Sequence, residues 1–289
     1  MKWGYLIVLT VLLSSCGAAQ EEKAERAEVA EPQAKQDLDE AKKALLATLE
    51  KEGVDADLKA QTISVAAVVN EPSDALEYLL IHSRGKGHEA LFVTEVKPSL
   101  LNSAFILLGF KKGKNASYKD KVPPPTREEV EKGASWVDVF PPEGEASWMT
   151  VSWTDEEKKV HDVVVDDLLV DLHEQMPVRD NAWIYLGGNM APLYRNEPPV
   201  FVADFEGNLV SICYMSPPNH LLTLRHERAR DDQNWWKSEL CPPPETKVRF
   251  TFHRRMPAVA KERAARIEKS KKAAGDGAVE KGTEKADKR

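Results

Sequence analysis

Apolar residues occur along this chain in short runs and in strict alternation with polar residues, a pattern typical of β-strands. Between residues 248 and 253, Val, Phe and Phe alternate with Arg, Thr and His, as in a strand with one buried and one solvated face. Turn-forming residues join two pairs of runs across 154–157 and 206–208, which predicts two hairpins. The predicted strands are residues 62–69, 76–81, 90–95, 148–153, 158–165, 200–205, 209–214 and 248–253.

Two segments have helical spacing instead. Residues 38–49 carry leucine and alanine at intervals of three and four, and Gly53 follows as a C-terminal stop. We expect this stripe to pack on the domain rather than on a membrane or a partner. Ser99 precedes a leucine-rich run that ends at Gly109, which predicts a helix capped by the serine and stopped by the glycine. That run is apolar on most faces, so we expect the second helix to be buried.

The elements predict an α+β fold, namely a single β-rich domain built as a curled antiparallel sheet or partial barrel with one buried helix. Residues 111–134 are polar and rich in proline, and we expect them to form a surface excursion. The expected divisions are a signal peptide (1–15), a flexible tether (16–36), an amphipathic helix (37–57), a globular domain (58–256) and a charged tail, disordered or partly helical (257–289).

The N-terminus has the pattern of a lipoprotein signal peptide. Lys2 precedes an apolar run at residues 5–13, and two serines then lead to Cys16. A membrane-spanning helix needs about 20 apolar residues, so this run is too short, and an ordinary secretory signal is the alternative. The motif resembles the lipobox of bacterial lipoproteins, which implies palmitate or similar acyl chains on Cys16. We expect these chains to hold the protein to a cell-envelope membrane, facing the periplasm or the exterior.

Composition narrows the possible partners. A net charge of −7 gives no general attraction to phosphate backbones, so we expect no binding to nucleic acid. The three cysteines are too widely spaced for zinc patterns and too few for an iron–sulfur cluster. We therefore expect no cofactor and no metal.

One loop is the leading candidate for a site. Arg84, Lys86, His88 and Glu89 lie with two glycines between two predicted strands. The glycine amides could cradle an anion that Lys86 and His88 neutralise. The structural interpretation, which we favour, is a turn that His88 and Glu89 tie down.

Other polar groups favour structural roles. A metal site is conceivable in the acidic segment 166–174, but its spacing matches no defined site and a solvated turn is favoured. The same holds for His220 and His226. Trp235 and Trp236 could form an aromatic platform for a sugar or peptide, although packing in the core is favoured.

Cys213 and Cys241 are expected to form a disulfide, because export would place them in an oxidising compartment. Closing that loop would stabilise the fold by about 3.5 kcal/mol in the chain-entropy model. Two buried thiols are the alternative, since Cys213 lies within an apolar run.

Three groups of short segments follow one another in an order and spacing that resemble a known domain family. They are Gly85–Glu89 with Val96–Ser99 and the helix ending at Gly109, Trp183–Gly188 with Ala203–Gly207, and Asn234–Trp235 with Pro242–Pro243 and Lys247–Val248. Together they resemble the YdjY-type domain of bacterial exported proteins over about residues 60–255. This chain has Gly187-Gly188 where we would expect Gly-Ser, so a hydroxyl is missing there. The resemblance implies one continuous domain, sometimes found near iron–sulfur modules, and no particular reaction.

These observations predict a membrane-anchored, non-catalytic binding or assembly module whose partner is an envelope protein or a small ligand. The alternative hypothesis is an envelope enzyme or redox-accessory protein. In that case His88 and Glu89 would act as acid, base or ligand, and Lys86 would hold an anionic substrate. The sequence lacks a Gly-x-Ser-x-Gly elbow for nucleophilic catalysis, which favours the first hypothesis.

Overall fold

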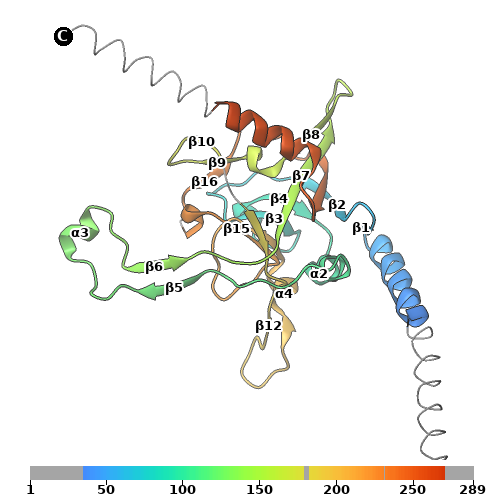
Figure 1. The fold of residues 1–289 in the computed structure, drawn as a ribbon, viewed down its shortest axis with the longest axis horizontal. Helices are drawn as coiled ribbons and strands as arrows, with labels where there is room; N and C mark the ends of the chain where they lie inside the picture. Colours follow the sequence, from blue (N-terminus) through green and yellow to red (C-terminus); the bar gives the residue numbers. More distant parts are fainter. Residues whose placement is uncertain (1–34, 179–181, 231, 271–289) are drawn as a thin grey trace, which may run out of the picture. The chain divides into compact units, whose positions relative to one another are not determined.

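The computed structural model describes residues 35–178, 182–230 and 232–270 (Figure 1). The chain divides into two units, residues 1–48 and 49–289. The described part of the first unit is helical, as the leucine spacing predicts, and the helix continues to residue 51. None of the helices in the described ranges is both long and apolar enough to cross a membrane. The expected signal peptide, Cys16 and the tether lie outside the described residues.

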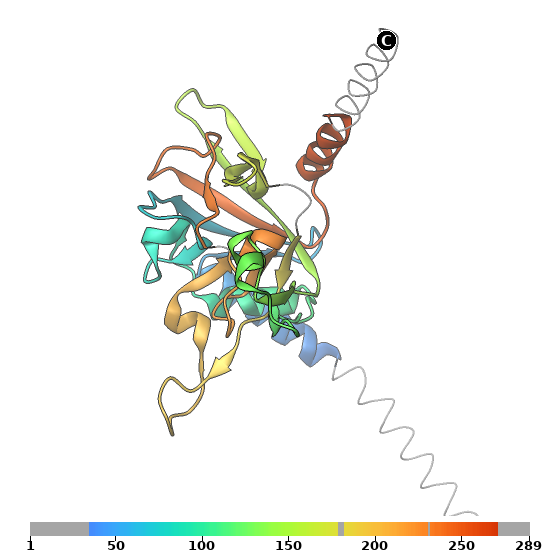
Figure 2. The ribbon, with the colours of Figure 1, turned by 90° about the vertical axis from the view of Figure 1, so that its left-hand side faces the viewer.

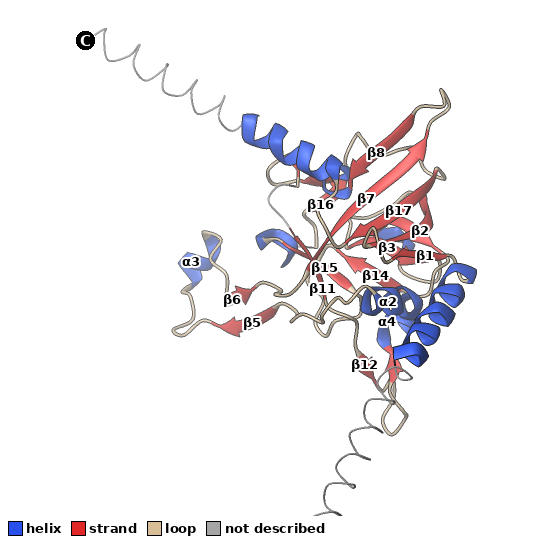
Figure 3. Ribbon diagram, turned by 45° about the vertical axis from the view of Figure 1, so that its right-hand side comes forward, coloured by secondary structure: helices blue, strands red, loops and turns tan. Residues whose placement is uncertain are grey.

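Eight strands of the second unit form a closed barrel (Figures 1 and 3). In order around the barrel they are β2 (Thr62–Val69), β17 (Lys247–His253), β7 (Ala146–Thr154), β11 (Ala182–Tyr185), β15 (Leu222–Arg225), β14 (Asn208–Ser211), β3 (Tyr78–His82) and β4 (Ala90–Thr94). Neighbours are antiparallel except for the pairs β3–β4 and β14–β15, which are parallel. The strands β1 (Val54–Asp57) and β8 (Val160–Val164) lie beside β2 and β7.

Closure is where the architecture differs from the predicted curled sheet or partial barrel. Strand β4 pairs with β3 on one edge and with β2 on the other, through Val68 opposite Val93 and Val69 opposite Phe92. The sequence contained the strands but not this second pairing, because pairing partners far apart in the chain leave no local pattern. The fold also contains helices beyond the amphipathic segment and the one buried helix that the sequence predicts, and β1 occupies residues 54–57, within the segment predicted to be helical.

Aromatic side chains fill the barrel core. Phe92 and Phe250 meet edge to face with ring centroids 5.6 Å apart. Phe105 stacks on Tyr185 at 4.9 Å and meets Phe252 edge to face at 5.2 Å. A barrel of eight strands has an interior that side chains can fill, and these rings pack there together with buried aliphatic side chains.

Helix α2 (Pro98–Leu107) brings Phe105 into that core. Its N-cap is Lys97, not the predicted Ser99, and Pro98 occupies the first turn. The Ser99 amide instead donates to Asp204 Oδ1 at 2.7 Å, so a carboxylate from another helix satisfies the helix end. Gly109 follows with φ +81°, as its predicted role as a stop requires. Helix α2 is buried on one face only, in contrast to the prediction, because Ile106 is 60% exposed.

The predicted hairpin over residues 200–214 is wrong. Val202–Glu206 form helix α4, which ends at Gly207 in the left-handed conformation. The short strand β13 (Val200–Phe201) pairs with β12 (Met190–Ala191), whereas β14 pairs with β3 and β15. The apolar run was long enough for a strand, but the glycine ends a helix rather than forming a hairpin turn. By contrast, the predicted hairpin at 148–165 is confirmed by β7 and β8, which extend together from the barrel (Figure 2).

The remaining elements lie around the barrel. They are β5 (Ser117–Asp120), α3 (Arg127–Glu131) and β6 (Val137–Phe140) in and after the predicted excursion, the small sheet of β9 (Leu169–Asp171), β10 (Met176–Pro177) and β16 (Trp235–Lys237), and the 3₁₀ turns η1 (Gly87–Glu89), η2 (Val165–Leu168) and η3 (Glu227–Arg230). A C-terminal helix covers residues 258–270, and Arg263 ties it to Asp167 at 2.6 Å. The rest of the predicted tail lies outside the described residues.

Candidate ligand-binding site

Two glutamates lie side by side at the edge of the barrel. Strands β3 and β4 are parallel, with Tyr78 opposite Ala90, so the residues just before them, Glu77 and Glu89, are also neighbours. The Glu77 amide donates to the Glu89 carbonyl at 3.0 Å. The Glu77 carbonyl in turn accepts the amide of Ile212 at 2.8 Å. Backbone hydrogen bonds therefore fix both residues.

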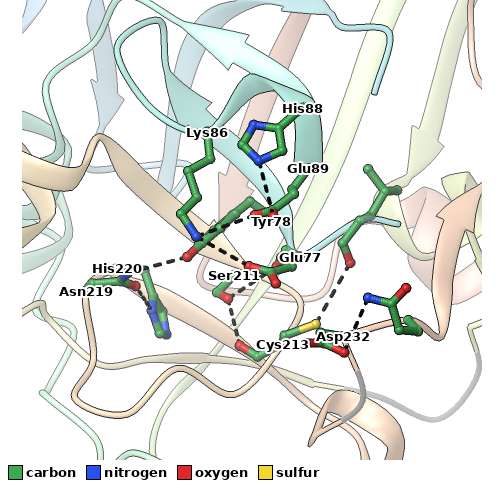
Figure 4. Close-up of polar contacts among 12 residues, drawn as sticks. Glu77, Tyr78, Lys86, His88, Glu89, Ser211, Cys213, Asn219, His220 and Asp232 are labelled. Carbon is green, nitrogen blue, oxygen red and sulfur yellow. Dashed lines mark hydrogen bonds and ion pairs between the residues drawn. The ribbon is translucent and has the colours of Figure 1, made fainter. Parts of the chain in front are cut away.

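Four polar side chains converge at this position, and Figure 4 shows them pointing toward one another. Lys86 Nζ lies 3.8 Å from Glu77 Oε2 and 3.5 Å from Glu89 Oε2, and His88 Nε2 lies 3.3 Å from Glu89 Oε1. The two carboxyl groups are 17% and 18% exposed, whereas Lys86 and His88 are about half exposed. We call Glu77, Tyr78, Lys86, His88 and Glu89 the rim site.

The two carboxyl groups do not both ionise readily. Burial, a hydrogen bond with Glu89 and the charge of that residue raise the pKa of Glu77 to about 7. Lys86 opposes this shift, and Asp232 adds to it. Like charges directly opposite each other on neighbouring strands are destabilising. The raised pKa of Glu77 therefore favours a proton on the carboxyl pair at a pH well above the usual range of a glutamate.

A buried aromatic ring lies under the Lys86 ammonium group, and polar contacts lead from its hydroxyl to a buried imidazole. Lys86 Nζ lies 5.8 Å from the centroid of the buried Tyr78 ring. Asn219 Nδ2 donates to the Tyr78 hydroxyl at 3.4 Å, and Asn219 Oδ1 lies 3.0 Å from His220 Nδ1. Burial lowers the pKa of His220 to about 3, so the ring is neutral with its proton on Nδ1. Its Nε2 has no hydrogen-bond partner among the described residues.

The candidate loop is built differently from the predicted anion cradle. The Gly85 amide donates to the His82 carbonyl at 2.7 Å and the Gly87 amide to the Gly85 carbonyl at 3.0 Å, so neither amide is available to a ligand. Gly85 is required by packing, since a Cβ there would lie 2.9 Å from the Gly207 carbonyl oxygen. The structure brings Lys86, His88 and Glu89 together, but it places no side-chain contact of Arg84 in this cluster.

The acidic side chains of segment 166–174 form ion pairs with arginines of other elements. Arg228 binds Asp171 at 2.8 Å and Glu174 at 2.5 Å, and Asp167 holds Arg263 of the C-terminal helix. Among the described residues, no group of three or more His, Cys, Asp or Glu side chains is placed to hold a metal ion. The tryptophan platform is also not formed, because Trp235 is fully buried. His226 meets its ring edge to face at 5.3 Å.

The expected disulfide is not present. Cys213 and Cys241 are both thiols, and their sulfurs lie next to different carbonyls, of Leu76 at 3.9 Å and of Leu168 at 3.7 Å. Burial raises the pKa of Cys241 to about 12, which keeps that thiol protonated. The two cysteines lie in the segments that follow β14 and β16, and spacing along the chain does not tell how far apart those segments are in the fold.

Sequence reasoning missed three contributors to the site and its support, namely Glu77, Tyr78 and Asn219, and it gave His220 a structural role without linking it to this site. One signal was available, since Glu77 is a charged residue inside an otherwise apolar predicted strand. Tyr78 looked like an ordinary core residue. Asn219 and His220 lie in the connection between β14 and β15, which is far from the loop in the sequence.

Comparison with known proteins adds one finding. The YdjY domain matches residues 54–253, from the start of β1 to the end of β17. The comparisons with curated proteins and with solved structures gave no match. The match includes every residue of the rim site.

Proposed function

The chain belongs to the YdjY domain family, and we propose that it is a lipid-anchored envelope protein whose barrel binds a ligand or partner at the rim site. One observation carries the binding role: two carboxyl groups are held opposite each other by backbone hydrogen bonds, although their charges repel. Fixed, unfavourable charge arrangements with a strongly shifted pKa concentrate at functional sites, because stability alone does not select for them.

Binding is favoured over catalysis by the state of Lys86. In the enzyme hypothesis this lysine holds an anionic substrate, yet its ammonium group already lies between Glu77 and Glu89. Excess negative charge at the rim site repels an anion. The pKa of Glu77 would suit a general base, but the nearby Ser211 hydroxyl donates to the backbone carbonyls of Glu77 and Cys213, at 3.3 and 2.7 Å, rather than to the Glu77 carboxyl group.

Attachment is the second part of the proposal and rests on the sequence before Cys16. The change Cys16→Ala removes the site of acylation, so we expect the protein to move from the detergent phase to the aqueous phase in a Triton X-114 partition of expressing cells. Cys241→Ala, which leaves the N-terminus intact, is the matched control. A Cys16→Ala protein that stays in the detergent phase contradicts the anchor.

The binding role is tested by NMR titration of the purified chain, with ¹³C labels in the glutamate carboxyl groups and the histidine rings. The probes are inorganic phosphate, acetate, ethylammonium and neutral N-acetylglucosamine. We expect at least one probe to shift Glu77, Glu89 and His88 together, and to lose this effect in Glu77→Gln/Glu89→Gln. If no probe moves these signals, the rim site is not a binding site for these chemical classes and the proposal fails.

A further inference from the structure

The ammonium group of Lys86 lies where a cationic ligand of the rim site would lie. It is within 3.8 Å of one carboxyl group and 3.5 Å of the other, above the face of Tyr78. Carboxylates accept the three N–H donors of an ammonium group, and an aromatic face attracts its charge. The surroundings of Lys86 are therefore those of an ammonium-binding site.

Lys86 is held loosely in that position. Charge-assisted hydrogen bonds are usually about 2.7–2.9 Å long, and both of its distances to oxygen exceed that range. Its side chain remains 46% exposed. Glu89 Oε2, its nearer neighbour, is a buried oxygen without a hydrogen bond among the described residues. The carboxyl pair is thus only partly satisfied by the cation that lies beside it.

We propose that the rim site recognises a primary ammonium group, and that Lys86 is its resident occupant, which an external ammonium group displaces. This inference rests on the proposed function and names the ligand chemistry of the same site. Three observations carry it together: the facing carboxyl groups of Glu77 and Glu89, the Tyr78 ring beneath the cation, and the long contacts of Lys86.

The loop permits the exchange. Gly85 is fixed against Gly207, so the backbone before Lys86 keeps its place. A Cβ at Gly87 would meet nothing within 4 Å, so the space after Lys86 is open. The long lysine side chain can swing into solvent by rotation about its own bonds, without a change in the strands.

The Tyr78 ring is supported by polar contacts that do not involve Lys86. Asn219 donates to the Tyr78 hydroxyl and, through its Oδ1, fixes the neutral His220 ring, which is fully buried. Because Asn219 and the His220 ring are both uncharged, this support adds no competing cation to the site. The energetic competition is therefore between the ammonium of Lys86 and that of the ligand.

The test is calorimetric titration of the full chain and its variants with Nα-acetyl-lysine methylamide, and separately with 1,4-diaminobutane. The first probe represents a lysine side chain and the second a free diamine, so the two arms distinguish the sources of the ammonium group. Nα-acetyl-norleucine methylamide has a similar shape without the charge. If Lys86 occupies the site for about nine-tenths of the time, Lys86→Ala raises the apparent affinity for ammonium about tenfold.

We expect Lys86→Ala and Lys86→Met to bind at least one ammonium probe about tenfold more tightly than the unchanged chain. Neither variant should bind the norleucine compound. Adding Glu77→Gln to Lys86→Ala should remove most of the gain. Lys247→Ala, which removes an exposed lysine at the start of β17, should match the unchanged chain.

If both Lys86 variants bind the ammonium probes no more tightly than the unchanged chain, the inference is overturned. Should phosphate, acetate or a sugar still shift the rim signals by NMR, the proposed binding role stands without it. If no compound shifts those signals in the unchanged chain or in Lys86→Ala, both proposals fail.

Discussion

The rim site and the Arg228 cluster (Asp171, Glu174 and Arg228) each contain two carboxyl groups and one cationic side chain, but the pKa of a carboxyl group is raised in the first and lowered in the second. Arg228 reaches its two carboxylates at 2.8 and 2.5 Å, whereas Lys86 lies 3.5 and 3.8 Å from its own. Burial alone would raise the pKa of Asp171, but hydrogen bonds from the Glu174 amide, Asn234 and Arg228 lower it. The pKa of Glu77 is raised instead.

The difference separates a structural ion cluster from a binding site. In the Arg228 cluster, the planar guanidinium satisfies both partners, and Asp171 Oδ1 also accepts the backbone amide of His173 at 3.0 Å. In the rim site the flexible lysine leaves a proton shared between the carboxyl groups. The first arrangement stabilises the connection between η3 and the small sheet, and the second keeps its carboxyl groups ready for another cation.

The largest expected effect is that of removing Arg228. The change Arg228→Met leaves the carboxylate of Asp171, which is 4% exposed, without its cation, so we expect the free energy of unfolding to fall by about 3 kcal/mol. Urea denaturation followed by circular dichroism at pH 7 measures it. The control is Arg249→Met, whose partner Asp55 is exposed, and which should change the value by less than about 0.5 kcal/mol. Equal losses in the two variants would contradict the structural role.

A smaller effect of opposite sign is expected at Glu77. Because its pKa is raised from 4.5 to about 7, the folded chain binds a proton more tightly than the unfolded chain. This contribution to stability is complete below pH 4.5 and is lost as the pH rises through 7. Glu77→Gln keeps a neutral group opposite Glu89, so above pH 7 we expect it to be more stable than the unchanged chain by about 1 kcal/mol.

The measurement at Glu77 is urea denaturation at pH 5, 7 and 8.5. The charged groups that face this side chain are Glu89, Lys86 and Asp232. The advantage of Glu77→Gln should grow across the series, and Glu50→Gln, at an exposed position, should show no such trend. A pH-independent difference would mean that the carboxyl pair does not share a proton.

The sequence predicted local structure well where the pattern itself is local. β2 has the predicted bounds of 62–69, β17 alternates as expected, and the β7–β8 hairpin forms across its turn residues. Closure of the barrel depends on β2 meeting β4, which lie apart in the chain. No periodicity within either strand could report that.

The same distinction applies to the site. Lys86, His88 and Glu89 were found because they lie within one loop. Glu77 was missed because only the parallel pairing of β3 and β4 brings it beside Glu89. This pairing changes which ligand charge the loop is suited to bind. With one carboxylate, Lys86 looks like a free cation suited to an anion. With two, it becomes the occupant of an acidic site.

The smallest expected effect distinguishes the two clusters most directly. Lys86→Met keeps the apolar stem and removes the charge, and because the contacts are long and half exposed we expect the free energy of unfolding at pH 6 to change by no more than about 1 kcal/mol. The titration of Glu77 should respond more clearly. Lys86 lowers the pKa of Glu77, so its removal should move the carboxyl midpoint, followed by ¹³C NMR, upward from about 7. A loss of stability as large as that of Arg228→Met would make Lys86 a structural tie, and the rim site would then be a second Arg228 cluster.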